Sequence, residues 1–250
     1  MLEIVDHGRV REVRLAHPPA NAMSPELISK LLEKLEQSAN TADAVVVSGR
    51  PGMFSAGLDI PALLPLDRAA LLNFWHLFLD LLRTIAHMPV PTVFALTGHA
   101  PAGGIVISLF GDYRIMSRGN YKTGLNEVQV GLVVSPVIKN ALVRLIGPHP
   151  AEKILVPGAM LSPDQALAIG LVDELADTPE ATVARAVNWC EYLLSLPRNA
   201  MTLTRQLARE DLRAYFEEVS PYSTETFADL WFSDMTQQTL RGLVARLKKT

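Results

Sequence analysis

The stretch Thr97-Gly-His-Ala-Pro-Ala-Gly-Gly-Ile105 follows the apolar, β-branched run Thr92-Val-Phe-Ala-Leu96 and leads into an apolar segment that ends at Phe110. The run predicts a buried strand, and the apolar segment predicts a short buried helix. Glycines allow a sharp turn and let bare backbone N–H groups approach a ligand. Because a helix N-terminus adds the positive end of the helix dipole, this unit predicts backbone donors that face a negatively charged group.

A second glycine-containing loop lies upstream. Ala44-Val-Val-Val-Ser48 predicts another buried strand, and it leads to Phe54-Ser-Ala-Gly-Leu-Asp59. Two backbone N–H groups aimed at one point form an oxyanion hole, and losing one donor typically lowers a rate by ~10²–10³. Gly124-Leu-Asn-Glu127 follows the two loops and offers a carboxylate as a base. Two donor loops and a base in this order predict an enzyme that forms an enolate.

Helix and strand signals alternate along much of the remaining chain. Apolar runs around Ile4 and at Val13-Arg-Leu15 flank Asp6-His-Gly8, which predicts a β-hairpin. Asp67 is a predicted cap for a long helix over residues 71–88. Further helices are predicted where a capping residue precedes proline, at residues 24–25, 135–136, 162–163 and 178–179.

The last part of the chain has helix signals only. Beyond Pro197 the pattern is helical, with an interruption near Ser220-Pro221. Alternating strands and helices followed by helices alone predict an α/β core with a helical C-terminal appendage. We therefore divide the chain into a core over residues 1–196 and a helical region over residues 197–250.

Length and composition narrow the class of protein. The chain has 250 residues, of which 49% are hydrophobic, enough for one large domain or for a domain with a smaller appendage. A net charge of -3 with scattered Lys and Arg indicates no nucleic-acid partner. The single cysteine, Cys190, excludes an internal disulfide and a cysteine-rich zinc site. His76 and His149 have no partners at ligand spacing, so no metal is predicted.

The sequence shows none of the common signals for secretion, membrane insertion or peroxisomal import. The N-terminal residues lack the basic start and apolar run of a signal peptide. No stretch reaches the roughly eighteen consecutive apolar residues of a membrane helix, and Lys248-Lys-Thr250 does not match a peroxisomal tripeptide. We therefore expect a cytoplasmic protein without a membrane partner.

The two loops resemble those of the crotonase (enoyl-CoA hydratase/isomerase) superfamily. The resemblance is carried by Phe54-Ser-Ala-Gly-Leu-Asp-Ile60, by the stretch from Thr97 to Ile105 and by Gly111-Asp-Tyr-Arg-Ile115. Gly124-Leu-Asn-Glu-Val-Gln-Val-Gly-Leu132 is similar to the corresponding stretch of mitochondrial-type Δ3,Δ2-enoyl-CoA isomerases. The likeness covers nearly the whole chain.

This resemblance implies a ββα spiral core, a C-terminal helical region that builds a trimer, and an acyl-CoA thioester as substrate. Coenzyme A is then part of the substrate, so no separate cofactor is expected, and the homotrimers could pair into hexamers. The helical region carries more apolar surface than it can easily bury on its own subunit, so we expect part of this surface at a subunit interface. The residues that contribute it are Phe227, Leu230, Trp231, Leu240, Leu243, Val244 and Leu247. By resemblance, Phe232, Lys248 and Lys249 would approach the CoA of a neighbouring site.

The resemblance also implies residues of the site. The backbone N–H groups of Leu58 and Gly103 match the two oxyanion-hole donors. Ser55, Ala56 and Gly57 would line the path of adenine and pantetheine through main-chain contacts.

Three neighbours of these groups have competing interpretations. Asp59 could be a second acid, but a carboxylate directly after an oxyanion donor is more often bound to N–H groups of its own loop; we include it among the substrate-binding residues. Asn126, also included, would shape the acyl pocket, orient the glutamate or cap a turn. His99 is expected to be a turn residue rather than an acid-base group.

Glu127 is the predicted catalytic base. It precedes the apolar run from Val128 to Val134, and a carboxylate with such neighbours is partly desolvated, which raises its pKa toward that of a useful base. Hydratases of the superfamily carry a glutamate three residues after the central glycine, where this chain has Val106. Hydration shares its proton transfers between two glutamates, whereas one carboxylate can carry a proton from C2 to C4 of a 3-enoyl chain.

These observations predict a Δ3,Δ2-enoyl-CoA isomerase with Glu127 as the proton shuttle. Two alternatives stay open. One is another crotonase-type reaction, such as weak hydration or dienoyl isomerisation, and the other is acyl-CoA binding without turnover. The presence of Glu127 argues against a pure binding protein, since binding alone needs no base there.

Overall fold

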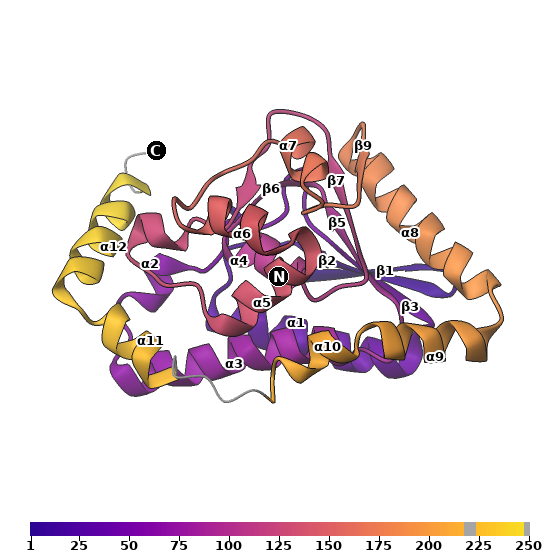
Figure 1. The fold of residues 1–250 in the computed structure, drawn as a ribbon, viewed down its shortest axis with the longest axis horizontal. Coiled ribbons are helices and arrows are strands. Elements are labelled where there is room, and N and C mark those ends of the chain that lie inside the picture. Colours follow the sequence, from indigo (N-terminus) through magenta and orange to yellow (C-terminus); the bar gives the residue numbers. More distant parts are fainter. Residues whose placement is uncertain (218–223, 248–250) are drawn as a thin grey trace.

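Two β-sheets form the centre of the computed structural model, which describes residues 1–217 and 224–247 (Figure 1). The large sheet has the strand order β1-β2-β3-β5-β7-β9, and the small sheet has the order β4-β6-β8. β1 (Leu2–His7) and β2 (Val10–Leu15) form the predicted antiparallel hairpin. The other neighbouring strands pair in parallel.

The chain builds both sheets by repeating one unit. In each unit a strand of the large sheet leads into a short strand of the small sheet and then into a helical segment. The paired strands are β3 (Ala44–Ser48) with β4 (Gly52–Met53), β5 (Thr92–Leu96) with β6 (Gly98–Pro101), and β7 (Tyr113–Ser117) with β8 (Thr123–Gly124). Because the strands within each sheet are parallel, successive units stack in one orientation. This is the ββα spiral of the crotonase fold, as the resemblance implied.

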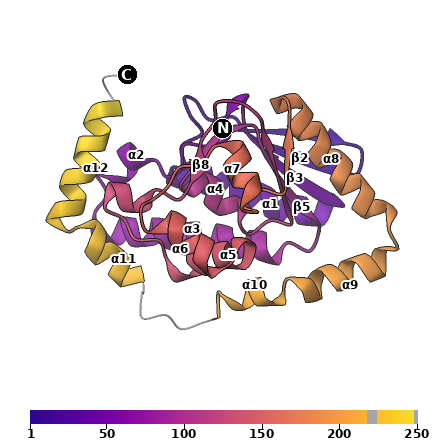
Figure 2. The ribbon, with the colours of Figure 1, turned by 45° about the horizontal axis from the view of Figure 1, so that its top comes forward.

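Helices fill the connections and form the C-terminal part of the chain. They are α1 (Pro25–Thr41), α2 (Ile60–Leu63), α3 (Arg68–His87), α4 (Gly103–Ser108), α5 (Pro136–Ile146), α6 (Pro148–Leu155), α7 (Pro163–Ala168), α8 (Pro179–Ser195), α9 (Arg198–Ala208), α10 (Glu210–Ala214), α11 (Thr224–Trp231) and α12 (Asp234–Leu247). A 3₁₀ turn, η1 (Glu127–Val130), and β9 (Glu174–Ala176) complete the described elements. Figure 2 shows α11 and α12 at the opposite end of the molecule from α8 and α9.

The large sheet is buried on both faces. Val45 and Val47 of β3 belong to the main core, together with apolar residues of α1 and α3. Ala44 and Val46 face the other way, into a smaller cluster with residues of α8 that include the buried Cys190. This arrangement explains why β3 is apolar at successive positions instead of alternating. α3 has the length and hydropathy of a membrane-crossing helix, but it contributes eight buried residues to the protein.

The strongest local sequence signals predicted the correct elements. Ser24, Asp67, Ser162 and Thr178 cap α1, α3, α7 and α8 with their side chains, as predicted. Ser135 precedes α5 without a capping side-chain hydrogen bond. The strands of the small sheet are only two to four residues long, which is too short for a recognisable sequence pattern.

The C-terminal residues correct one expectation. Phe227, Trp231 and Leu240 are 2%, 0% and 0% exposed within a single chain, so the premise that they need a second subunit to cover them is wrong. α11 packs on α3 of its own chain, and α12 packs on η1 and α2. Leu243 and Val244 are partly buried, while Leu247 is exposed. Ser220-Pro221, Lys248 and Lys249 lie outside the described residues.

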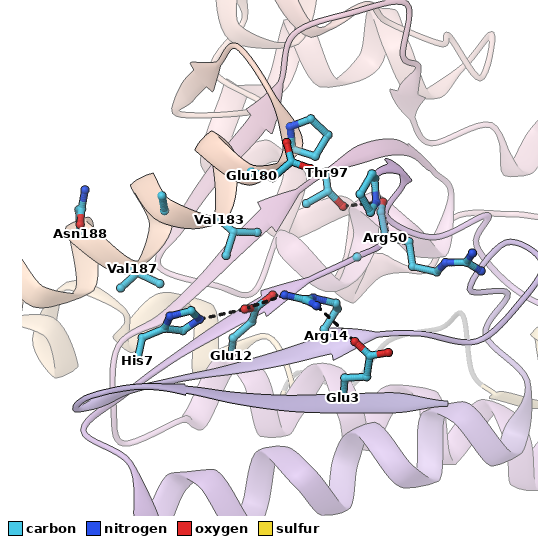
Figure 3. A pocket seen from close by; sticks show the side chains of 14 residues that line it. Glu3, His7, Glu12, Arg14, Arg50, Thr97, Glu180, Val183, Val187 and Asn188 are labelled. Carbon is cyan, nitrogen blue, oxygen red and sulfur yellow. Dashed lines mark hydrogen bonds and ion pairs between the residues drawn. The ribbon is translucent and has the colours of Figure 1, made fainter.

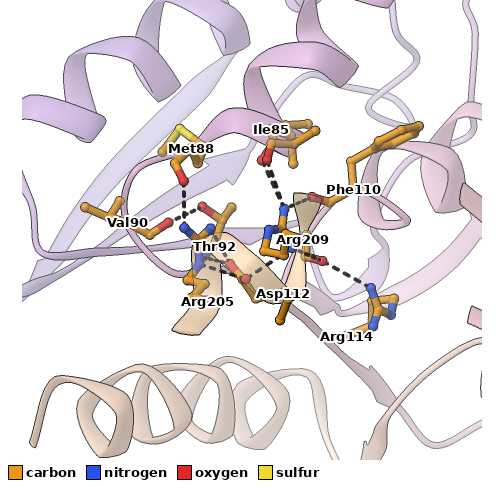
Figure 4. A network of polar contacts seen from close by, with 12 residues as sticks. Ile85, Met88, Val90, Thr92, Phe110, Asp112, Arg114, Arg205 and Arg209 are labelled. Carbon is orange, nitrogen blue, oxygen red and sulfur yellow. Dashed lines mark hydrogen bonds and ion pairs between the residues drawn. The ribbon is translucent and has the colours of Figure 1, made fainter. Parts of the chain in front are cut away.

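A buried ion-pair network attaches α9 to the core (Figure 4). Asp112 is 7% exposed in its side chain and pairs with Arg205 and Arg209, which are 9% and 8% exposed. Arg205 also donates to the carbonyl of Met88 (2.7 Å), after α3, and Arg209 donates to that of Phe110 (2.6 Å), after α4. The two arginines therefore satisfy carbonyls at the C-terminal ends of two core helices.

Replacing the shared carboxylate should destabilise the protein strongly. In Asp112→Ala both arginines stay buried without their counter-charge, so we expect the free energy of unfolding to fall by about 3–5 kcal/mol. The exposed pair of Asp80 and Arg83 supplies the control, because Asp80→Ala should cost under about 1 kcal/mol. Urea unfolding of the two variants measures both values, and equal losses would contradict the role given to Asp112.

Candidate active site

Asn21 fixes the first glycine loop, and the sequence analysis did not assign it a role. Its backbone has φ 51°, in the left-handed region that asparagine tolerates better than most residues. Its side-chain amide donates to the carbonyls of Leu15 (3.0 Å) and Phe54 (2.9 Å), and its Oδ1 accepts from the N–H of His17 (2.7 Å). The one indication of this role in the sequence was the asparagine in the segment Pro-Pro-Ala-Asn-Ala.

Ser55 orders the turn that follows. Its hydroxyl donates to the carbonyl of Asn21 (2.7 Å) and accepts from the N–H of Gly57 (3.1 Å). Ser55 is fully buried, so its side chain serves the loop rather than the surface. Gly57 has φ 84°, which favours glycine, and it brings the chain to Leu58.

The N–H of Leu58 faces away from the neighbouring segment. Met23 donates to the carbonyl of Gly57 (2.8 Å) and accepts from the N–H of Asp59 (3.2 Å). In an extended bridge the residue between these two groups presents its own N–H to the opposite side. Within residues 1–217 and 224–247, no protein group accepts a hydrogen bond from this N–H. Leu58 thus offers a free backbone donor.

Gly103 offers the second donor. It is the first residue of α4, so its N–H has no partner within the helix. The preceding Ala102 has φ 44° and ψ -123°, a strained conformation for a residue with a side chain. Ala102 therefore redirects the chain abruptly from β6 into α4. This strain was not predictable from the sequence, since alanine gives no signal of a positive φ.

The two donors are close because the loops touch through their backbones. A Cβ atom added to Gly103 would lie 3.3 Å from the nitrogen of Leu58, and one added to Gly57 would lie 3.2 Å from the nitrogen of Gly103. A Cβ atom on Gly104 would lie 2.8 Å from the carbonyl oxygen of Ser55. Glycines at these positions leave room for the contact, which brings the predicted donors Leu58 and Gly103 together.

Glu127 lies at the start of η1, beside these donors. Its Oε2 atom is buried and has no hydrogen-bond partner among the described residues. Burial raises the pKa of Glu127 to about 7, although a hydrogen bond from its own backbone N–H lowers it in part. The predicted desolvation of this carboxylate is confirmed. A carboxylate with this pKa is suited to accept a proton near neutral pH.

Thr236, from α12, supports the turn that carries Glu127. Its hydroxyl donates to the carbonyl of Gly131 (2.9 Å), directly after η1. The N–H of Leu132 in turn donates to the carbonyl of Glu127 (2.9 Å). Gly131 has φ 80°, and a Cβ atom there would lie 3.1 Å from the Thr236 hydroxyl. The C-terminal helical region therefore helps to position Glu127.

A narrow cavity of about 20 Å³ joins the two donors and the carboxylate. Leu58, Gly103 and Glu127 all line it, and so does Val106, which is 1% exposed. The remaining lining residues are apolar or aromatic: Trp75, Phe78, Leu132, Val133, Val134, Ile138 and Phe227. Val106 therefore occupies a wall of the cavity that holds the base, and Glu127 is the only carboxylate among the described lining residues.

The other predicted residues lie around this centre. The carboxylate of Asp59 accepts from the N–H of Ala62 (3.0 Å) and caps α2, in line with the loop-binding interpretation. Asn126 is half-buried before η1 and makes no side-chain capping bond. Ala56 is exposed next to the buried Ser55. His99 lies in strand β6 and not in the predicted turn, and its Nδ1 accepts from the N–H of Lys122 (3.1 Å).

A larger cleft of about 620 Å³ lies elsewhere, between the first hairpin and α8 (Figure 3). Its floor carries Glu12, a fully buried carboxylate bonded by Ser48, His7 and Arg14. Burial favours a higher pKa for Glu12, but these hydrogen bonds outweigh it and lower the pKa. Glu12 is thus a satisfied structural anion, unlike Glu127, and we place the active site at the smaller cavity.

Two free backbone donors and one desolvated carboxylate that line the same apolar cavity are suited to proton abstraction beside a carbonyl group. The family model for enoyl-CoA hydratase/isomerase matches residues 6–249. The chain belongs to the enoyl-CoA hydratase/isomerase family.

Relatives in this family include both isomerases and hydratases. The chain is 30% identical over 245 residues to human mitochondrial enoyl-CoA delta isomerase 1, covering 96% of this chain and 80% of the relative. It is 31% identical over 193 residues to the protein named "Probable enoyl-CoA hydratase echA17" from Mycobacterium avium, covering 76% and 74%. The crystal structure of human mitochondrial delta3-delta2-enoyl-CoA isomerase superposes with a TM-score of 0.92 at 28% identity, over 99% and 98% of the two chains.

The raised pKa of Glu127 predicts a pH-dependent stability difference. The folded state binds the proton of Glu127 more tightly than the unfolded state, so this residue's contribution to stability is lost as pH rises from about 4.5 to about 7. Glu127→Gln removes that cost. The variant should therefore gain up to about 3 kcal/mol relative to wild type between pH 4.5 and pH 8.

Urea unfolding of both proteins at several pH values measures this change. Glu36→Gln is the matched control, because it makes the same change of charge at an exposed position on α1, outside the cavity. A pH-independent difference for Glu127→Gln would contradict the desolvation of this carboxylate.

Proposed function

We propose that this protein is a Δ3,Δ2-enoyl-CoA isomerase. The observation that carries the proposal is the pairing of one desolvated carboxylate, Glu127, with the two backbone donors of Leu58 and Gly103 in a cavity that has Val106 on its wall. Isomerisation needs one proton carrier, and these described residues supply one.

The chemistry follows from the positions of these groups. The thioester carbonyl accepts hydrogen bonds from the N–H groups of Leu58 and Gly103, and negative charge that develops on its oxygen is stabilised there. Glu127 removes a proton from C2, which gives a dienolate. The same carboxyl group then delivers the proton to C4, and the double bond moves from C3 to C2. Ser55, Ala56, Gly57, Asp59 and Asn126 would contact the substrate around this centre.

Hydration is the second candidate, since relatives named as hydratases are nearly as similar as the isomerases. Water addition needs a polar group to orient and activate the water. In this cavity that second position is Val106, whose apolar side chain cannot accept a hydrogen bond. This favours isomerisation over hydration, dienoyl isomerisation that uses further acids, and binding without turnover.

Several accompanying expectations stay predictions. They are a homotrimer or hexamer, no metal and no cofactor apart from the CoA of the substrate, no nucleic-acid or membrane partner, and a cytoplasmic location. The exposed apolar residues Leu203 and Leu207 on α9 are 60% and 72% exposed. They are better candidates for a subunit contact than the buried Phe227 and Trp231.

Replacing the base should abolish isomerisation. Glu127→Gln keeps the side chain's shape, but its amide cannot accept the C2 proton, so we expect the rate with a 3-enoyl-CoA to fall by about 10²–10⁴-fold with little change in binding. In wild type, kcat/KM should fall about tenfold per pH unit below pH 7, because only ionised Glu127 is a base. A variant that keeps a tenth of the wild-type rate would refute the assignment.

The residue at position 106 in the cavity wall should control hydration. Wild type should hydrate 2-enoyl-CoA far more slowly than it isomerises 3-enoyl-CoA, and Val106→Glu should raise hydration because a second carboxylate can activate water. A buried carboxylate can also destabilise α4, so Val106→Gln serves as a control of similar size that adds no base. Comparable hydration and isomerisation rates in wild type would overturn the argument from Val106.

A further inference from the structure

Gln129 belongs to the same turn as Glu127 but lies on its other side. η1 is a 3₁₀ turn of four residues, and because three residues complete one turn of such a helix, the two side chains point in different directions. Glu127 lines the cavity, whereas Gln129 is exposed and is absent from the described lining. Any influence of Gln129 on Glu127 must therefore pass through the backbone of η1.

The side-chain amide of Gln129 attaches η1 to the residues that follow α6. Its Nε2 donates to the carbonyl of Gly158 (2.9 Å) and to that of Pro157 (3.2 Å). Gly158 has φ 65°, and a Cβ atom there would lie 3.2 Å from the Cα atom of Asn126. Residues 157 and 158 therefore contact η1 both through a side chain and through close backbone packing.

These residues begin a segment, residues 157–161, which we call the strap. Further along the strap, Leu161 and Thr123 exchange two backbone hydrogen bonds (2.8 and 3.0 Å). The strap is also tied to α6, because the N–H of Ala159 donates to the carbonyl of Ile154 (2.8 Å), a residue of the main core. The strap is thus fixed to the core at one end and to the strand before Glu127 at the other.

η1 needs such external contacts to keep its position. A 3₁₀ turn has poorer hydrogen-bond geometry than an α-helix, and Val128 within it is 40% exposed, so packing on this side is limited. Thr236 supports the end of the turn through Gly131, and Gln129 supports its middle. A reacting group must stay within about 0.5 Å of its productive position, so a small movement of η1 should affect the reaction more than the fold.

We propose that Gln129 is a positioning residue for Glu127: its amide ties η1 to the strap, and this tie determines where the carboxylate lies in the cavity. The inference rests on the proposed function, since it concerns the base of the same reaction. Without the tie, η1 can move outward, and water can then reach the carboxylate and reverse its desolvation. A role in stability alone would leave the environment of Glu127 in the folded protein unchanged.

The pH dependence of stability tests this tie without turnover. The stability difference between wild type and Glu127→Gln varies with pH because burial raises the pKa of Glu127 to about 7. We expect the pH-dependent part of this difference to shrink to less than about half when both proteins also carry Gln129→Ala, because the carboxylate is then hydrated. Urea unfolding at several pH values measures it, and an unchanged pH dependence would overturn the proposal.

Gln37→Ala is the matched control. Gln37 is exposed on α1, where its amide donates to Glu33 (2.7 Å) and accepts from Lys34 (2.8 Å). Its replacement removes the same chemical groups away from the cavity, so the pH dependence should stay at the wild-type value. Thermal melts check that both variants fold, and equal changes in the two variants would contradict the role of Gln129.

Turnover separates this inference from the proposed function. With a 3-enoyl-CoA, kcat should fall about 3–10-fold in Gln129→Ala, with KM nearly unchanged, and the acid limb of the kcat/KM profile should move to lower pH. Gln129→Glu should show a similar fall in kcat near neutral pH, because its carboxylate keeps the shape of the side chain but cannot donate to the two carbonyls.

Two outcomes would decide against different conclusions. If wild type isomerises the substrate and Gln129→Ala keeps the same kcat and pH profile, the positioning role is wrong and the isomerase stands. If wild type does not react, the proposed function fails, and the urea measurements still decide whether Gln129 controls the environment of Glu127.

Discussion

The close contact between two loops is the constraint on which the site depends. The parallel pairing of β4 with β6 brings the loop before Leu58 against the loop before Gly103. Oxyanion donors are effective only when their direction is fixed before the reaction begins. Here the direction is set by covalent geometry, by the strained Ala102 and by the hydrogen bonds of Asn21. Both donors are backbone groups, so no side chain has to move to form them.

The same arrangement makes the ionised form of Glu127 energetically unfavourable. Glu127 loses hydration without gaining a partner for Oε2, and this is why its pKa rises to about 7. Glu12 shows the alternative, because there three polar side chains stabilise the buried anion and lower its pKa. The protein thus contains one carboxylate that is stable and unreactive and one that is destabilised and available. The packing that surrounds the second, including Thr236, must offset its cost.

How much of this could be predicted from sequence depended on how local each signal was. Caps, prolines and apolar runs act within a few residues, so α1, β3, β5 and α8 were predictable. The loops and Glu127 were predictable from motifs whose glycines have a physical role. The small sheet, the positive φ of Ala102 and the contact of Thr236 with Gly131 were not, since each is imposed by residues distant in sequence. The apolar C-terminal residues indicated that another part of the protein must cover them. Their sequence did not indicate that this part is α3.

The packing of the apolar C-terminal residues on α3 changes the role that we assign to the C-terminal region. A boundary after residue 196 follows the end of α8 and precedes α9, yet Phe227 and Thr236 beyond it line the cavity and support the turn of Glu127. A core without α11 and α12 would therefore keep both backbone donors but lose an aromatic wall and a contact that supports the turn of Glu127. Water would then reach the carboxylate, its pKa would fall toward the ordinary value and its strength as a base would decrease. The C-terminal helices are thus part of the candidate active site, whatever they contribute to assembly.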